Sequence, residues 1–324
     1  MANIREVAKK AGVGVGTVSR ALNNTGYVAE ETRQKILEAV EELEYMPNEL
    51  AKQLFRNRNG IIGVMVPNLE HPFFAKMMRY IEMELSKYDY KCLACNTIEI
   101  DNRQQGFMDM LERNMVDGII TCVDPLPDFA SRKGKAIVSM DRKWGPDVPI
   151  VRSDHEQGGR LAAEAFIKNG CKKVVQFCSG RQHYDTANIR HEVFAQVLRE
   201  NQCEVITIGT KWDALSYAYN KSIILQYMDI ITDADGMMTN DIGAMSCLAV
   251  AQKMGIKVPE ELKIVGYDGT EITNLTYPEL SVVVQDCAVL ARNCVDIVLQ
   301  MIDGKEPEAM QVLVPVSWKQ GGTT

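Results

Sequence analysis

The sequence predicts a small all-α head, a short hinge segment and a larger α/β core of two doubly wound parallel-sheet subdomains. Three observations lead to this prediction. The first 45 residues hold three apolar stripes with helical spacing, and Pro47 then interrupts the pattern. From residue 61 onward, Val- and Ile-rich runs alternate with amphipathic stretches. A chain of 324 residues with 46% hydrophobic content can bury the cores that this division needs.

The composition favours a cytoplasmic protein. No run of about 18 apolar residues is present, so we expect no membrane span. The first residues, MANIREVAKKAG, lack the apolar segment of a secretory signal. Nine cysteines at irregular spacings do not form a disulfide framework, and we interpret them as reduced thiols.

The net charge of −7 at first argues against a nucleic-acid partner, but the charge is unevenly distributed. Residues 1–29 carry +3 and residues 46–59 carry +2, while 30–45 carry −4 and 60–324 carry −8. A basic head on an acidic body is consistent with a local polyanion contact. The charge alone is equally consistent with ordinary surface variation.

Helical spacing predicts three helices in the head. The first is predicted by Ile4, Val7, Ala8 and Ala11, with Asn3 and Glu6 placed to form a capping box. The second stripe consists of Val15, Val18 and Leu22. The third consists of Ile36, Val40 and Leu43, with acidic Glu30 and Glu31 at the helix start.

Three alternating glycines in AGVGVGTVSR, at Gly12, Gly14 and Gly16, raise the alternative of a phosphate-binding loop. A dinucleotide-binding loop follows a strand, whereas a helix is predicted here, and Thr17 occupies the position of the third glycine. The Gly-Lys-Ser/Thr of a P-loop is also missing. The glycines therefore indicate the turn of a helix-turn-helix, where Gly12 adopts a positive φ at little cost.

A helix-turn-helix of this kind places its second helix in the major groove of DNA. We expect Val15, Gly16 and Arg20 to face the DNA, and Thr17 and Ser19 to reach phosphates or bases. Arg20 is the best candidate for bidentate pairing with guanine.

The stretches IREVAKKAGVGVGTVSRALN and TRQKILEAVEELEYMPNELAKQL resemble the DNA-binding head of the lac repressor family (LacI/GalR). The resemblance continues to Trp318. Asn23 completes the candidate DNA-binding residues of the head. Gly14 and Ala29 stand where the family usually has capping serines, and Gly16 stands where the family commonly has a base-reading side chain.

The segment YMPNELAKQLFRNRNG holds a separate candidate DNA contact. A lone helix of this length is unstable in water, so it would order only against a partner. The resemblance implies a hinge that folds on DNA, pairs with its dimer mate and inserts Leu54 into the minor groove, with Ala51 allowing close helix approach. The alternative is a disordered linker.

Apolar runs predict eight strands of the core. They are IIGVMV (61–66), KCLACN (91–96), DGIITCV (117–123), KAIVSM (135–140), KKVVQF (172–177), EVITIG (204–209), ADGMMT (234–239) and LKIVGYD (262–268). Amphipathic stretches at 101–113, 154–169, 187–200 and 241–254 predict helices between them. Such alternation is typical of parallel sheets covered on both faces. The resemblance implies the type I periplasmic-binding-protein fold.

The resemblance also implies domain boundaries. The head is 1–46, the hinge 47–59 and the core 60–324. Within the core, the first subdomain covers about 60–153 and 286–305, and the second about 154–285 and 306–324.

Polar and aromatic residues follow the predicted strands, where ligands of such sheets bind. The family's effector-contacting positions fall on Phe73, Asp141, Arg190, Trp212, Asn240, Asp268 and Gln285. Each has a purely structural alternative: Asp141 or Asp268 could cap loops, Trp212 could lie in the core, and Arg190 could pair with Glu192. Cys287 stands where some sugar-binding members have an aromatic residue.

Motifs that would indicate catalysis or metal binding are incomplete. Cys92 and Cys95 match C-x-x-C, but they lie in a predicted strand without a second pair or a nearby histidine. His155-Glu156 lacks a second histidine at the metalloprotease spacing, and Ser179 lies outside a GxSxG motif. We therefore predict that the protein is not an enzyme and expect no cofactor.

We expect a ligand-responsive repressor that binds double-stranded operator DNA as a C2 homodimer and is released by a small carbohydrate. The alternatives are a purine- or nucleoside-dependent corepressor type, a catabolite regulator that docks a phosphoprotein, and a solute-binding protein without DNA contact. The final residues, PVSWKQGGTT, hold no heptads, so we expect dimers rather than tetramers.

Overall fold

The structure, a computed structural model, describes residues 2–23, 26–45, 58–98, 103–126, 134–179, 185–211 and 215–324. Contacts divide the chain into two compact units, Met1–Asn59 and Gly60–Thr324.

The first unit is a three-helix head with α1 (Ile4–Ala11), α2 (Val15–Asn23) and α3 (Glu30–Glu42). Its core is centred on Val7, Val18 and Ile36, which are fully buried. The predicted capping box is present: Asn3 Oδ1 accepts from Glu6 N at 3.2 Å, and Glu6 Oε2 accepts from Asn3 N at 2.9 Å. Gly12 ends α1 with φ +68°, as predicted for the turn.

The second unit begins with a six-stranded sheet whose strand order is β11-β5-β4-β3-β1-β2, with every pairing parallel. Its strands are β1 (Ile61–Val66), β2 (Lys91–Asn96), β3 (Gly118–Thr121), β4 (Ile137–Met140), β5 (Ile150–Ser153) and β11 (Gln311–Val314). Helices α5 (Pro72–Ser86) and α12 (Cys287–Ile302) cover one face. Helix α6 (Arg103–Glu112) covers the other.

A second six-stranded sheet has the order β12-β10-β9-β8-β6-β7. Its strands are β6 (Lys173–Cys178), β7 (Glu204–Gly209), β8 (Gly236–Met238), β9 (Lys263–Asp268), β10 (Ser281–Gln285) and β12 (Val316–Lys319). The helices on one face are α7 (His155–Lys168) and α8 (Ile189–Glu200). Those on the other are α9 (Tyr217–Gln226), α10 (Met228–Thr232) and α11 (Asp241–Met254). A 3-10 helix, η2 (Glu271–Leu275), follows β9.

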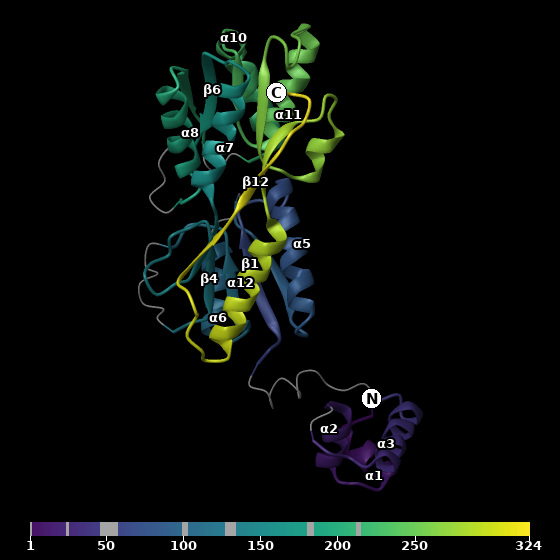
Figure 1. The fold of residues 1–324 in the computed structure, drawn as a ribbon. Coiled ribbons are helices and arrows are strands. Elements are labelled where there is room, and N and C mark those ends of the chain that lie inside the picture. The colour runs from purple at the N-terminus through teal and green to yellow at the C-terminus, as the bar shows by residue number, and fades with distance from the viewer. Residues whose placement is uncertain are drawn as a thin grey trace. The chain divides into compact units, whose positions relative to one another are not determined.

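The two sheets share one strand order, and the chain passes between them three times (Figure 1). The first two crossings follow β5 and β10. The third differs from the expected boundary at about 306, because Gln311–Val314 pairs with β5 of the first sheet. Pro315 separates this strand from β12, which pairs antiparallel with β10. The crossing to the second subdomain therefore lies at Pro315, and each subdomain gains an edge strand.

Two adjacent glycines in α7 bring the elements of the second subdomain close together. A Cβ on Gly158 would lie 2.1 Å from the Tyr267 hydroxyl, and a Cβ on Gly159 would lie 2.3 Å from the Arg190 backbone oxygen. These glycines therefore allow α8 and β9 to approach α7 at the end of the subdomain that faces the first sheet. No helix among the described residues is long and apolar enough to span a membrane.

Candidate functional site

The candidate DNA-binding surface lies on α2 and its N-terminal end. Val15, Gly16 and Arg20 are exposed, whereas Thr17 and Ser19 are half-buried. Arg20 Nη2 donates to Thr17 Oγ1 at 3.3 Å, so the guanidinium lies along the outer face of the helix. Val18, between them in sequence, is fully buried and anchors the helix to the head core.

The backbone of Gly16 borders open space on this surface, because a Cβ built there would have no atom within 4 Å. The backbone therefore approaches a ligand more closely at this position than a side chain would permit. Asn23 is the last residue of α2. Ala51 and Leu54, the candidate hinge contacts, lie outside the described residues, as does Trp212.

Six of the seven candidate effector-binding residues line one cavity between the two sheets of the second unit. The cavity has a volume of about 150 Å³. Three of these residues lie at strand ends: Asp141 follows β4, Asp268 ends β9 and Gln285 ends β10. The other three lie at helix starts: Phe73 on α5, Arg190 on α8 and Asn240 as the N-cap of α11. The carboxyl ends of the strands meet here, as expected for doubly wound sheets.

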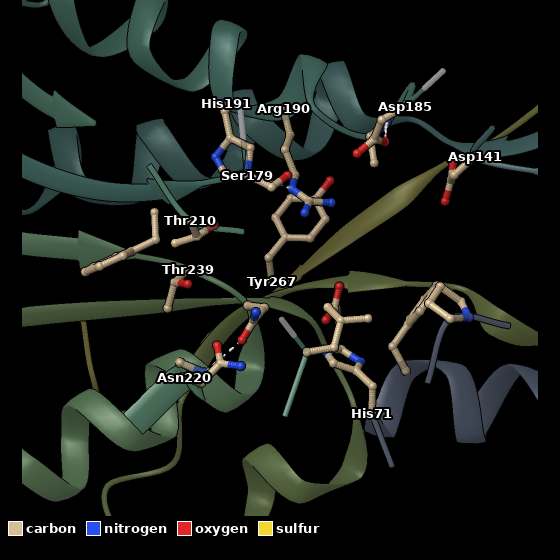
Figure 2. A pocket seen from close by; sticks show the side chains of 18 of the residues that line it. His71, Asp141, Ser179, Asp185, Arg190, His191, Thr210, Asn220, Thr239 and Tyr267 are labelled. Atoms are coloured by element: carbon tan, nitrogen blue, oxygen red, sulfur yellow. Dashed lines mark hydrogen bonds between the residues drawn. The ribbon is translucent and has the colours of Figure 1, made fainter. Parts of the chain in front are cut away.

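The cavity also contains residues that the sequence analysis did not single out. His71, Phe74, Thr210, Asn220, Thr239 and Tyr267 contribute to its lining. Ser179, already named as lying outside a GxSxG motif, follows β6 and lines the cavity as well. Figure 2 shows His71 on the side of the first subdomain and Arg190 and His191 on the opposite side. Cys287, which stands where some sugar-binding members of the family have an aromatic residue, packs in the core of the first subdomain and does not line the cavity.

Asp141 carries the negative charge of the pocket on the side of the first subdomain. Its Oδ1 lies 2.9 Å from His155 Nε2, and the other ring nitrogen of His155 lies 3.1 Å from the Tyr267 hydroxyl. Burial alone would raise the pKa of Asp141, but His155, Arg142 and Arg190 outweigh burial and lower it. Asp141 is therefore ionised and oriented before a ligand binds.

The pKa of Asp268 is shifted in the opposite direction to that of Asp141. Burial raises the pKa of Asp268 well above its usual range, and the neighbouring Asp241 carboxyl raises it further. Gln285 Nε2 donates to Asp268 Oδ1 at 2.9 Å. Burial also raises the pKa of Asp241 to about 6, although Thr270 N and Oγ1 donate to its Oδ2, each at 2.7 Å. The two carboxyl groups cannot both ionise at low cost, so Asp268 holds its proton more tightly.

The aromatic wall comes from the start of α5. Phe73 and Phe74 form an edge-on pair with ring centroids 5.4 Å apart, and His71 lies 5.5 Å from Phe74. His71 Nδ1 is buried and has no hydrogen-bond partner among the residues that the structure describes. Burial, followed by the Arg190 charge, lowers the pKa of His71 to about 4. An unpaired buried nitrogen costs about 1–3 kcal/mol, which a ligand hydroxyl would recover.

Among the described residues, ion pairs join the subdomains on either side of the pocket. Arg142, after β4, pairs with Asp185 before α8, and its Nε lies 3.3 Å from Asp124. On the other side, Lys76 Nζ from α5 lies 3.0 Å from Glu271 Oε1 and 3.4 Å from the Gly269 oxygen. Contacts of this kind are made only while the subdomains are close together.

The site combines carboxylates, amides, a guanidinium and aromatic rings. Within the part of the chain that the structure describes, no group of three or more His, Cys, Asp or Glu residues is placed to hold a metal ion. Such groups can bind a small polyhydroxylated molecule, whose hydroxyls would donate to carboxylates and whose CH groups would pack on aromatic faces.

Comparison with known proteins matches both parts of the chain. The family model described as bacterial regulatory proteins, lacI family, matches residues 3–48. A model described as periplasmic binding protein-like domain matches residues 163–324. Both matches agree with the division into a helical head and an α/β core.

Individual relatives align along nearly the whole chain. The sucrose operon repressor of Streptococcus mutans is 32% identical over 323 residues, which cover 99% of each chain. The HTH-type transcriptional repressor PurR of Haemophilus influenzae is 31% identical over 96% of this chain and 94% of its own length. The lac repressor dimer bound to operator and the anti-inducer ONPF gives a TM-score of 0.83 at 24% identity, over 100% of this chain and 99% of that chain. This last likeness confirms the predicted fold class.

Proposed function

The chain belongs to the lacI family of bacterial regulatory proteins, and we propose that a small carbohydrate releases it from its operator. It is a DNA-binding transcriptional regulator rather than an enzyme. The proposed DNA contacts are those of α2 together with Asn23, Ala51 and Leu54. The proposed effector contacts are the six pocket residues and Trp212. We further propose that it acts in the cytoplasm, as repression of an operon requires.

The observation that supports a carbohydrate is the balance of charge and polarity in the pocket. Asp141 is ionised, Asp268 holds its proton, and Arg190 supplies the opposite charge. A neutral molecule with several hydroxyls satisfies these groups without adding net charge to a buried site. Phe73 and Phe74 offer rings against which the CH face of a sugar packs.

A ligand panel tests this proposal. Sucrose, D-ribose, D-fructose, D-glucose, hypoxanthine and guanine would be titrated calorimetrically into wild type, Arg190→Ala and Arg160→Ala. Arg160 is an exposed arginine on α7 that does not line the pocket, so its variant controls for loss of charge. We expect a sugar to bind wild type and Arg160→Ala equally, and Arg190→Ala at least tenfold more weakly. Equal binding by all three proteins would contradict the placement of the site.

The second candidate effector is a purine that acts as corepressor. The similarity to PurR supports it, as does the aromatic wall, since a planar base also stacks on phenylalanine. The panel separates the two candidates, because binding of hypoxanthine or guanine alone would replace the carbohydrate proposal.

We also propose that the protein is a homodimer. Leu275 and Tyr277 in the second subdomain are 82% and 90% exposed, and Met254 at the end of α11 is 56% exposed. Gln252 Nε2 donates to the Tyr277 oxygen at 2.5 Å, so the segment after η2 lies beside the C-terminal part of α11, and we propose these exposed apolar residues as the dimer surface. Light scattering should show two chains for wild type and one for a Leu275→Asp, Tyr277→Asp variant. An unchanged mass would contradict this surface.

A further inference from the structure

Arg190 is held from two directions by side chains of its own subdomain. Its Cζ lies 4.5 Å from the centroid of the Tyr267 ring. Its Nε donates to His191 Nε2 at 3.2 Å. Figure 2 shows the guanidinium above the Tyr267 ring with the His191 imidazole beside it. Arg190 lines the pocket, and among the described residues no hydrogen bond involves its two terminal nitrogens.

The hydrogen bonds around His191 allow only one tautomer. Arginine has donors and no acceptor, so His191 Nε2 must present its lone pair to Arg190. His191 Nδ1 then carries the proton and donates to Gln176 Oε1 at 3.0 Å. The amide of Gln176 is oriented in turn, because its Nε2 donates to Thr207 Oγ1 at 3.0 Å and to the His191 backbone oxygen at 3.3 Å. Each side chain in this hydrogen-bond network therefore has donor and acceptor roles that agree with those of its partners.

The ring beneath Arg190 is held equally firmly. The Tyr267 hydroxyl lies 3.1 Å from His155 Nδ1, and His155 Nε2 lies 2.9 Å from Asp141 Oδ1. Tyr267, His155 and His191 are all buried. Arg190 is therefore placed between two networks of mostly buried side chains, one reaching Asp141 and the other reaching the exposed Thr207 on β7.

We infer that His191 is a positioning residue, whose unprotonated Nε2 binds Nε of Arg190 so that both terminal nitrogens of the guanidinium face the effector. This inference rests on the proposed function, in which Arg190 contacts the effector. The inference also narrows the chemical class of the effector. Two parallel N–H donors select a ligand with two adjacent acceptor oxygens, such as neighbouring hydroxyls or a ring oxygen beside a hydroxyl.

The surroundings of His191 keep this acceptor available. The charged or titratable groups that act on its ring are Arg190 and His155, while its direct partner on β6, Gln176, is uncharged. Burial, then the Arg190 charge and then His155 lower the pKa of His191 well below its usual range. The imidazole is therefore neutral near pH 7, as the hydrogen bond from Arg190 requires.

Two variants of similar size separate positioning from simple packing. His191→Gln can place an acceptor near the Nε2 position, whereas His191→Asn reaches only as far as Nδ1 and leaves Arg190 Nε without its partner. Sugar affinity would be measured for both, alone and combined with Arg190→Ala, using the panel sugar that wild type binds. We expect about a tenfold loss for His191→Asn, recovery of most of it for His191→Gln, and no further loss from His191→Asn when Arg190 is already alanine.

A measurement without ligand completes the test. In full-length protein labelled with nitrogen-15 in histidine and arginine, NMR should show a protonated Nδ1 and an unprotonated Nε2 for His191. The Arg190 Nε–H signal should be shielded from solvent exchange in wild type and exchange faster in His191→Asn.

A proton on His191 Nε2, or wild-type sugar affinity in His191→Asn, would overturn the inference. An equal loss from His191→Asn with or without Arg190 would also overturn it, since His191 would then not act through Arg190. If Arg190→Ala binds sugar as wild type does, the proposed function fails instead, and the NMR result still decides how Arg190 is held.

Discussion

Two aspartates of the pocket have backbone conformations that side chains rarely adopt. Asp141 has φ +55° and Asp268 has φ +122°, and both lie at the carboxyl end of a strand. Such conformations cost about 1–3 kcal/mol each unless the surrounding structure holds them. Here both carboxyls are also engaged, Asp141 by His155 and Asp268 by Gln285. Both aspartates proposed to bind the effector therefore combine an unfavourable backbone conformation with a side chain that is held in place.

The raised pKa of Asp268 predicts a pH effect on stability. The folded protein holds a proton on Asp268 that the unfolded chain releases above about pH 4, so the free energy of unfolding falls as pH rises toward the raised pKa. Asp268→Asn preserves the hydrogen bond from Gln285 and removes this titration. Urea unfolding without ligand, from about pH 4.5 to pH 7.5, should show a smaller decline for the variant. Parallel pH profiles for the two proteins would contradict a protonated Asp268.

The glycines of the head give a matched pair of variants. Gly16→Ala should stabilise α2 by about 1 kcal/mol, because a Cβ there meets nothing and alanine favours helix. Gly12→Ala should destabilise the head by about 1–2 kcal/mol, because Gly12 has φ +68°. Hydrogen exchange of α1 and α2 amides in the full chain should become slower in the first variant and faster in the second. Changes in the same direction would contradict this account of the turn.

Six pocket residues could be predicted from the sequence, because parallel strands bring their carboxyl ends together and the family resemblance marks the positions there. His191 and Tyr267 could not be predicted in this way. Tyr267 lies inside a strand that is apolar on both faces, where its hydroxyl gives no local signal. Its partner His155 lies on another element, and Gly158, which makes room for the hydroxyl, is only an unexplained helix glycine in the sequence.

At the level of elements, the strands predicted from continuous apolar runs are present as β1–β4 and β6–β9. The predicted helices at 101–113, 154–169, 187–200 and 241–254 are present as α6, α7, α8 and α11. Strands β5, β10, β11 and β12, each of four or five residues, were not predicted. Strand β11 pairs with a strand about 160 residues earlier, so its place in the first sheet depends on a contact that no local pattern reports.

The ion pair between α5 and η2 predicts that a substitution outside the pocket affects closure of the two subdomains. Lys76 and Glu271 join the two subdomains, and neither lines the cavity. Lys76→Met should weaken sugar binding by about 1 kcal/mol, because the closed arrangement loses an ion pair.

Lys173→Met is the matched control for this variant. Its ion pair with Asp233, at 2.6 Å, lies within the second subdomain and does not change on closure. Calorimetric titration should therefore give a weaker affinity for Lys76→Met only. Equal affinities for both variants would show that the link between α5 and η2 does not contribute to closure.

At the scale of the whole molecule, the proposal connects two parts of one chain. The effector site lies between two subdomains that three crossings join, and the DNA-binding face lies on a separate helical unit. A sugar that holds the subdomains closed changes DNA affinity only if closed and open proteins bind DNA differently. The two binding events then share one coupling free energy, typically about 1–3 kcal/mol, and each ligand must weaken the other equally.

The most direct test is a DNA titration by fluorescence anisotropy, with operator selected from random sequence, at zero and saturating concentrations of the panel sugar. For wild type, the sugar should raise the Kd for DNA by about 5- to 150-fold. For Arg190→Ala, the Kd without sugar should equal that of wild type and should not change at the sugar concentrations that saturate wild type. A wild-type response in Arg190→Ala, or a wild-type Kd that does not depend on the sugar, would contradict control of DNA binding through this pocket.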